Sequence, residues 1–255
     1  MPVNIYYLYT VSATNSKAGN LWCVILAFNN LACFSTDLQF IRCACMLHYR
    51  FRVINNELET FASIWHFKRG ALVERKTCKS FLCELSYGHN ICDSIEMYRY
   101  CYGQFCNLVD QLNSTYQLHL LGCLSACFLK ILFNLYFSMF GYVIGTNGQK
   151  EHDELIRAIF WNVYYGIRFL TLIYVADATS KQAVYAKTLI SDVNNRYLDT
   201  STQEELQLFY TQISSRCIQF TACDFFTLNT RLITSAIAAG ATYLVILVQF
   251  HSGKN

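Results

Sequence analysis

The stretch LITSAIAAGATYLVILVQF, residues 232–250, runs for 19 residues without one charged side chain. A helix needs roughly 20 mostly apolar residues to cross the hydrocarbon core of a bilayer. At ~1.5 Å of rise per residue, this stretch is about as long as that core is thick. The sequence therefore predicts a membrane-spanning helix over residues 230–250, with residues 251–255 as a tail beyond it.

The composition extends this interpretation to the whole chain. Its 255 residues are 54% hydrophobic and only 15% charged, whereas roughly a quarter of the residues in a soluble domain are charged. The net charge of +3 is small, and no basic stripe follows a phosphate backbone, so nucleic acid is not an expected partner. The composition is typical of an all-α, polytopic transmembrane helical bundle that has the lipid bilayer as its partner.

Three more stretches are long and apolar enough to span the membrane, which brings the expected number of spans to about four. The first of them continues as a polar helix, and an amphipathic helix leads into the last span. The expected segments are a leading remnant or extracellular loop over 1–19, helices over 20–62, 117–145 and 158–180, loops over 63–116, 146–157 and 181–205, and the lead-in helix over 206–229.

Lysine and arginine near the ends of the spans predict the orientation, because such residues favour the cytosolic side. They occur in residues 63–116 and 181–205, so both segments are expected in the cytosol. The loop over 146–157 and the C-terminus then lie outside the cell. Asn113 begins a formal glycosylation motif, but its segment is cytosolic in this topology, and we expect it to be unmodified.

Residue patterns that would indicate catalysis or metal binding are missing from the sequence. Many of the 13 cysteines lie in apolar helical stretches, where cysteine behaves as a small hydrophobe. Their spacing does not match a zinc knuckle, and no histidine pair completes such a site. Paired carboxylates and nucleophile–base pairs are equally absent at useful spacing. We therefore expect no enzyme activity, no cofactor and no metal.

Single charges inside the expected spans are functional candidates, because a charge in the membrane is costly. Lys130 either has such a function or extends its long stem toward the cytosolic face. Arg168 and Asp177 are nine residues apart. They lie on opposite faces of one helix and cannot pair within it.

Polar side chains recur with a spacing of seven along the last span, at Ser235, Thr242 and Gln249. Each step of seven drifts by only about 20° around a helix, so the three residues form one stripe, with Ile246 nearly in line. The stripe could line a water-filled path, since unpaired polar groups are costly in hydrocarbon. Small and hydroxylic residues also let neighbouring helices approach closely, which is the alternative explanation.

The end of the chain resembles the signature of the insect gustatory receptor family. The signature residues are Thr242 and Tyr243, followed by five aliphatic residues and then by Gln249 and Phe250. Upstream, Phe225-Phe226-Thr227-Leu228-Asn229 is also similar to the way in which that family approaches its last helix. The sister family of insect odorant receptors usually lacks this ending.

The resemblance implies a tastant-gated, cation-permeable channel in the plasma membrane that mediates acceptance or avoidance behaviour. It implies a homo- or hetero-tetramer with other gustatory receptor subunits, a small-molecule tastant as ligand, and an extracellular C-terminus. The last helix of each subunit lines the pore. The implied pore and gate residues are Ser235, Thr242, Ile246, Gln249 and Phe250.

The same resemblance sets the expected extent of the chain. Subunits of that family have seven helices, and this sequence matches the fourth to the seventh. We therefore expect an N-terminally truncated receptor in which the walls contributed by three helices are missing. An odorant-receptor-like or internal nutrient-sensing channel, or a non-functional fragment of one, is the alternative interpretation.

Ligand binding in that family occurs in the outward half of the helical bundle, away from the pore axis. Aromatic walls with a few polar groups suit such a pocket, although Trp and Tyr also gather at membrane interfaces as anchors. The residues expected at that depth are Trp22, Phe28, Phe137, Phe140, Trp161, Asn162, Tyr164 and Tyr165.

Overall fold

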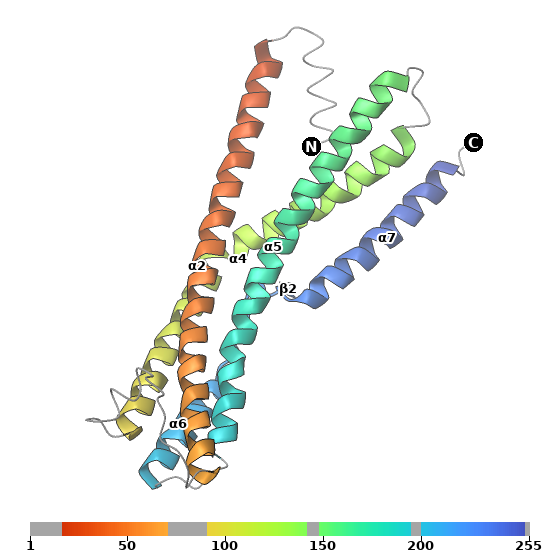
Figure 1. Cartoon of the computed structure of the whole chain (residues 1–255). Coiled ribbons are helices and arrows are strands. Elements are labelled where there is room, and N and C mark those ends of the chain that lie inside the picture. The colour runs from red at the N-terminus through yellow and green to blue at the C-terminus, as the bar shows by residue number, and fades with distance from the viewer. Residues whose placement is uncertain (1–16, 71–90, 142–147, 195–199, 253–255) are drawn as a thin grey trace. The chain divides into compact units, whose positions relative to one another are not determined.

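The computed structural model describes residues 17–70, 91–141, 148–194 and 200–252 of the chain (Figure 1). It confirms the all-α class, with one short β-hairpin between the last two helices. The elements in chain order are α2 (Lys17–Gly70), α4 (Ile91–Gly141), α5 (Gly148–Asn194), α6 (Thr200–Ser215), β1 (Thr221–Ala222), β2 (Phe226–Thr227) and α7 (Thr230–Ser252).

Three of the helices are much longer than a bilayer is thick. Helices α2, α4 and α5 have 54, 51 and 47 residues, which at ~1.5 Å per residue is about 70–80 Å each. The hydrocarbon core is only about 30 Å thick. Most of the length of each helix therefore lies outside that core.

The length of α4 corrects the loop expected over 63–116, because residues 91–116 are helical. The loop expected over 181–205 is wrong in the same way, since α5 continues to Asn194. Both segments are too polar to look like spans, but they bury apolar side chains at helical spacing. In α4 these side chains are Ile95, Tyr102, Cys106, Val109 and Leu112.

Three helices in the described part of the chain are long and apolar enough to cross a membrane. The candidate segments are Ile91–Tyr136, Leu155–Val193 and Thr230–Phe250. They contain the spans expected over 158–180 and 230–250 and the larger part of the one expected over 117–145. The span expected within residues 20–62 is not among them, and it stays a prediction.

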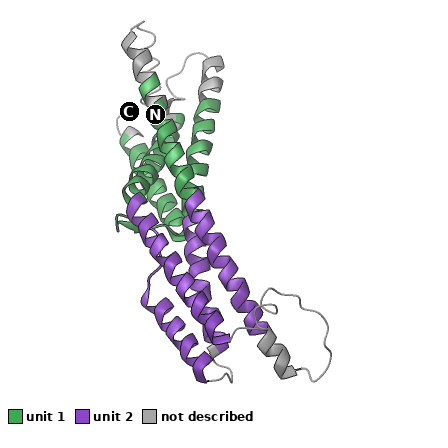
Figure 2. Cartoon of the chain, turned by 90° about the vertical axis from the view of Figure 1, so that its left-hand side faces the viewer, with its two compact units in different colours: residues 1–41, 116–175, 221–255 green, residues 42–115, 176–220 purple. Residues whose placement is uncertain are grey.

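The chain divides into two compact units, shown in green and purple in Figure 2. Unit 2 comprises residues 42–115 and 176–220, and the Tyr102 ring lies at its centre, with no exposed surface. The ring centroid of Tyr102 is 5.4 Å from that of Phe51 and 5.5 Å from that of Phe209. Its hydroxyl donates to the Ala183 carbonyl at 3.1 Å. This one side chain thus joins α4 to α2, α5 and α6.

Unit 1 comprises residues 1–41, 116–175 and 221–255. Within the part that is described, it contains the N-terminal portion of α2, the C-terminal portion of α4, the N-terminal portion of α5, the hairpin and α7. All of the site residues predicted from the sequence belong to this unit.

The lead-in helix expected over 206–229 is wrong beyond Ser215, where α6 ends. Ile218, Phe220 and Ala222 are buried in alternation with more exposed neighbours, and this period of two belongs to extended chain. The hairpin turn follows, with positive φ angles of 49° at Cys223 and 59° at Asp224. Three residues, 223–225, separate the paired strand ends Ala222 and Phe226, and the Phe225 backbone N–H donates to the Ala222 carbonyl at 3.1 Å to close the turn.

The last helix begins at a side-chain cap. Asn229 precedes the first residue of α7, and its Oδ1 accepts a hydrogen bond from the Leu232 backbone N–H at 3.1 Å. Asparagine is among the preferred N-cap residues because it satisfies one of the unpaired N–H groups of the first turn. Helix α7 thus begins at Thr230, directly after the hairpin and this cap.

Candidate functional site

Helix α7 has two different faces. Residues on one face are half-buried and recur at intervals of three and four, and they include Ile233, Ala236, Gly240, Leu244 and Leu247. Ser235 and Thr242 are exposed and lie roughly 140–160° around the helix from Gly240, by the 3.6-residue turn. The first face packs against the rest of unit 1, and the second points away from it.

The packed face meets α4 at a glycine. A Cβ atom added to Gly240 would lie 3.5 Å from Cε2 of Phe128, which is ordinary van der Waals contact. The α7 backbone at Gly240 therefore lies beside the Phe128 ring, at a distance that a methyl group would fill. This contact lies on the packed face, on the side of α7 away from the exposed Ser235 and Thr242.

The predicted pore and gate residues all lie on exposed positions of α7. Ser235, Thr242, Ile246, Gln249 and Phe250 are each exposed. The Thr242 hydroxyl donates to the Ala238 carbonyl of the same helix at 2.9 Å, so it is satisfied within α7. Tyr243 is also exposed, at 56%. It does not pack into the interior of its own subunit.

A buried polar cluster joins α2, α4 and α5 in unit 1. Asp37 of α2 is 1% exposed, and Arg168 of α5 is 8% exposed. Nε of Arg168 donates to Oδ2 of Asp37. On the α4 side, His119 Nε2 lies 2.7 Å from Asp37 Oδ1, and the Cys123 thiol donates to Asp37 Oδ2 at 3.5 Å. The carboxylate is therefore the centre of a three-helix contact.

The sequence interpretation missed this cluster, because it considered each charge only within its own helix. Asp37 and Arg168 are isolated charges in two different apolar stretches, and isolated intramembrane charges of opposite sign tend to pair. That signal could have linked them. The expectation that Arg168 and Asp177 do not pair is correct, since Asp177 binds Lys181 at 2.6 Å.

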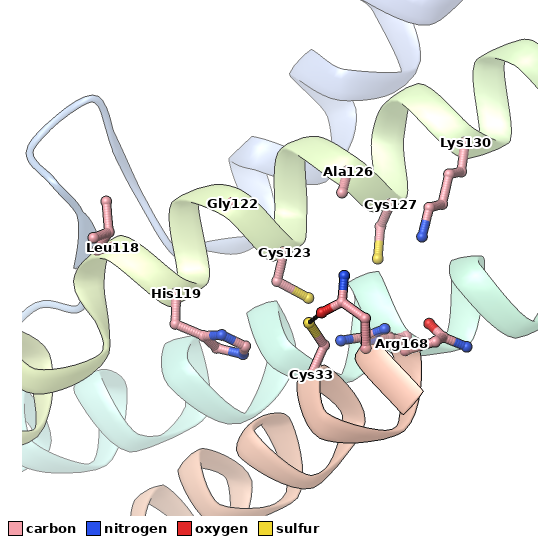
Figure 3. A pocket seen from close by; sticks show the side chains of 11 residues that line it. Cys33, Leu118, His119, Gly122, Cys123, Ala126, Cys127, Lys130 and Arg168 are labelled. Carbon is pink, nitrogen blue, oxygen red and sulfur yellow. Dashed lines mark hydrogen bonds between the residues drawn. The ribbon is translucent and has the colours of Figure 1, made fainter. Parts of the chain in front are cut away.

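A cavity of ≈ 390 Å³ lies beside the cluster (Figure 3). Its walls are formed by α2, α4 and α5, and several of the side chains that line it are polar or contain sulfur. Figure 3 shows His119, Cys123, Cys127 and Lys130 along α4, opposite Cys33 of α2 and Arg168 of α5. The remaining lining residues are Asn29, Asn30, Leu118, Gly122 and Ala126.

The Lys130 ammonium lies 4.6 Å from the centroid of the Tyr165 ring, a cation–π contact. Lys130 also lines the cavity. Its side chain is therefore engaged inside unit 1, between α4 and α5. A functional role for Lys130 stays a prediction.

Three of the predicted ligand residues form an aromatic cluster on α5. The Trp161 and Tyr165 rings stack with centroids 5.7 Å apart, and Tyr164 lies edge-on to both. Oδ1 of the neighbouring Asn162 and the Tyr165 hydroxyl are buried and have no hydrogen-bond partner among the described residues. Buried polar atoms usually have a hydrogen-bond partner, so these two atoms are candidates for hydrogen bonds to a ligand.

The other predicted ligand residues are not brought into this cluster. Phe28 is 71% exposed on α2. The side chains of Trp22, Phe137 and Phe140 lie outside the described residues. The structure thus places four of the eight predicted residues together, on consecutive turns of one helix.

Comparison with known proteins identifies the family. Residues 2–253 match the model of the 7tm chemosensory receptors. Among similar proteins of Drosophila melanogaster, the "Gustatory receptor for sugar taste 43a" is 22% identical over 56% of this chain and 32% of its own length. The "Gustatory and odorant receptor 21a" is 22% identical over 76% of this chain and 42% of its own length.

The chain spans only part of the length of these relatives, between 32% and 46% of the first two matched. The family match, in contrast, covers nearly the whole of this chain, and the apolar helices agree with a membrane-embedded receptor. The chain therefore belongs to the 7tm chemosensory receptor family, the family of the insect gustatory receptors.

Proposed function

We propose that the chain is a subunit of a tastant-gated cation channel, in which four copies of α7 line a central pore. The supporting observation is the division of α7 into two faces, one packed on unit 1 and one exposed. None of the residues in its most apolar stretch is buried among the described residues. A pore-lining helix has this property, because neighbouring subunits and water cover it only in the assembly.

The stripe supplies the polar surface that such a pore needs. Ser235 and Gln249 are exposed on the side of α7 opposite its packed face. The back-bonded Thr242 hydroxyl presents a weaker polar surface than its sequence suggests. In this proposal, Gln249 and Phe250 form the gate near the extracellular end, and the receptor is in the plasma membrane.

The ligand would bind between α4 and α5, near the aromatic cluster of α5. The Tyr165 hydroxyl and the Asn162 carbonyl oxygen are buried without a partner among the described residues, and a polyhydroxylated or amide-bearing tastant could satisfy both. One relative is named for sugar taste, which agrees with a hydroxyl-rich ligand. A relative named for both taste and odour makes an odorant-like ligand the second candidate.

Cysteine modification tests the pore assignment in cells that express the chain and respond to a panel of sugars, bitter compounds and volatiles. In the Thr242→Cys variant, a charged thiosulfonate reagent should reduce the ligand-evoked current, because the new thiol faces the ion path. The matched control is Ile237→Cys. Ile237 is 67% exposed but lies about 140° from Thr242 around the helix.

The wild-type chain supplies the baseline, since exposed native cysteines also react. We expect the control variant to reach the cell surface and to show no change in current beyond that baseline, because its thiol faces away from the water of the ion path. Equal effects at both positions would contradict the pore face. A folded, surface-exposed tetramer without any ligand-evoked current would contradict the channel.

A further inference from the structure

We propose that Asp37, His119 and Cys123 form a binding site for a divalent transition metal ion of the zinc class. The site lies between α2 and α4 in unit 1 and opens toward the cavity described above. It is independent of the pore assignment, because none of its residues belongs to α7.

The spacing of the three residues suits a metal ion. His119 and Cys123 are four residues apart on α4 and thus share one helical face. One ligand atom from each of the three residues lies within 4.8 Å of the other two. Bond lengths of about 2.0–2.3 Å place the ligand atoms of a tetrahedral zinc site roughly 3.3–3.8 Å apart. Small side-chain rotations are therefore enough to form the site.

The donor types select the ion. An imidazole nitrogen, a thiolate sulfur and a carboxylate oxygen are the three ligands that zinc uses. Magnesium and calcium ions prefer oxygen ligands, and each ion is bound by more ligands than zinc is. A set with one sulfur and one nitrogen therefore favours zinc and its neighbours in the transition series.

Arg168 prepares the carboxylate for this role. Its Nε donates to Oδ2 of Asp37, which leaves Oδ1, the atom 2.7 Å from His119 Nε2, to the ion. Ligating carboxylates are commonly held by such outer hydrogen bonds, which fix their orientation. Asp37 is 1% exposed, so its carboxylate is held by protein groups and not by solvent.

The cavity gives the ion a path to the site. His119 and Cys123 both line it, and the His119 side chain retains 22% of its exposure. Cys33 lines the same cavity from α2, one helical turn before Asp37. Three protein ligands leave a fourth position of a tetrahedral zinc ion for water or another ligand from the cavity.

Binding changes protonation and no oxidation state. The Cys123 thiol loses its proton to water in the cavity as the metal–sulfur bond forms. The neutral His119 ring gives up its contact with Asp37 Oδ1 and binds the ion through Nε2, with its one proton on Nδ1. One thiolate, one carboxylate and the nearby guanidinium leave the occupied site with a net charge of +1. The apparent affinity therefore rises with pH, because one proton is released for each ion bound. A bound ion links α2 directly to α4.

Cobalt binding tests the site in the full chain reconstituted in lipid nanodiscs. Wild-type protein should bind one Co²⁺ ion with a tetrahedral spectrum and a thiolate-to-cobalt charge-transfer band. Cys123→Ser should abolish that band. The matched control is Cys127→Ser, one turn further along the same cavity wall, which should keep it. Equal loss of the band in both variants, or no band in folded wild-type protein, would overturn the proposal.

A second measurement needs no substitution and therefore does not depend on how a variant folds. Zn²⁺ should protect Cys123 from alkylation in wild-type protein, as followed by peptide mass spectrometry, and should protect it better at higher pH. The exposed Cys217, which is far from these residues in sequence and belongs to unit 2, provides the internal reference. An alkylation rate at Cys123 that Zn²⁺ leaves unchanged would contradict the site.

Discussion

At the scale of single residues, Asp37 has an unusual number of partners for a carboxylate in an apolar helix. Its two oxygens interact with Arg168 of α5 and with His119 and Cys123 of α4. Taking a carboxylate and a guanidinium out of water is costly, and the cost is offset only when further hydrogen bonds complete the pair. The two α4 side chains provide that completion and make the cluster specific for this three-helix arrangement.

Removing one member of the ion pair should therefore be worse than removing both. Asp37→Leu leaves Arg168 as an uncompensated buried charge and should lower the free energy of unfolding by about 3–5 kcal/mol. The double variant Asp37→Leu/Arg168→Met replaces the pair by apolar groups and should recover most of that loss. Thermal unfolding in detergent measures both. A double variant no more stable than Asp37→Leu would contradict the pairing.

Sequence reasoning considered Arg168 only within its own helix and did not pair it with Asp37. Asp37 and Arg168 are separated by 131 residues, and their contact depends on how three helices pack, which spacing along one helix does not contain. The Trp161–Tyr165 stacking was accessible, in contrast, because residues four apart on a helix are neighbours. Local relations among site residues could thus be predicted from the sequence, whereas relations across helices could not.

At the scale of elements, α7 combines a small-residue contact with an outward stripe. Gly240 approaches the Phe128 ring of α4, while Ala239, its immediate neighbour, is exposed. Adjacent positions on a helix differ by about 100° in direction. Enlarging one of them therefore affects packing within the subunit, and enlarging the other affects the surface that faces away from it.

Substitution at this pair should separate the two effects. Gly240→Leu drives a large side chain into Phe128 and should lower the free energy of unfolding by roughly 1–3 kcal/mol. Gly240→Ala should be tolerated, since its Cβ meets Phe128 at ordinary contact distance. Ala239→Leu should leave thermal stability unchanged and reduce the ligand-evoked current. Equal thermal destabilisation by both leucine variants would argue against the packed face.

The hairpin before α7 is an element that the sequence did not predict. Alternating burial at Ile218, Phe220 and Ala222 lasts too few residues to outweigh the helical pattern of α6 in the sequence. Cys223 and Asp224 both have positive φ, yet neither is the glycine that usually marks such a turn. The apolar length of α7, in contrast, was sufficient to predict a helix that ends at the chain's C-terminal tail.

At the scale of the whole molecule, the two units divide the chain by composition as well as by contacts. Unit 1 contains α7 and the polar cluster, and unit 2 contains α6 and the Tyr102 core. Two positively charged segments, 63–116 and 181–205, are expected in the cytosol. The described residues of both belong to unit 2, except residue 116. The charge distribution thus assigns a cytosolic location to unit 2 as a prediction.

Asn113 provides a test of that orientation. The residue lies in α4 and in unit 2, and it begins an acceptor motif. If unit 2 is cytosolic, glycosylating enzymes never reach the motif, and endoglycosidase treatment should leave the electrophoretic mobility unchanged. An acceptor motif engineered into residues 251–255 is the positive control and should shift. A sugar at Asn113 would reverse the proposed topology.

The lack of burial along the apolar stretch of α7 also concerns how such a receptor is made in a cell. In the proposed tetramer, insertion of this helix is driven by transfer into lipid, and its lateral contacts are completed when the other subunits arrive. A copy synthesised without partners displays to chaperones and membrane proteases the surface that assembly would hide. Surface abundance would then follow the scarcest subunit, so that the dose of one gene limits the output of the others.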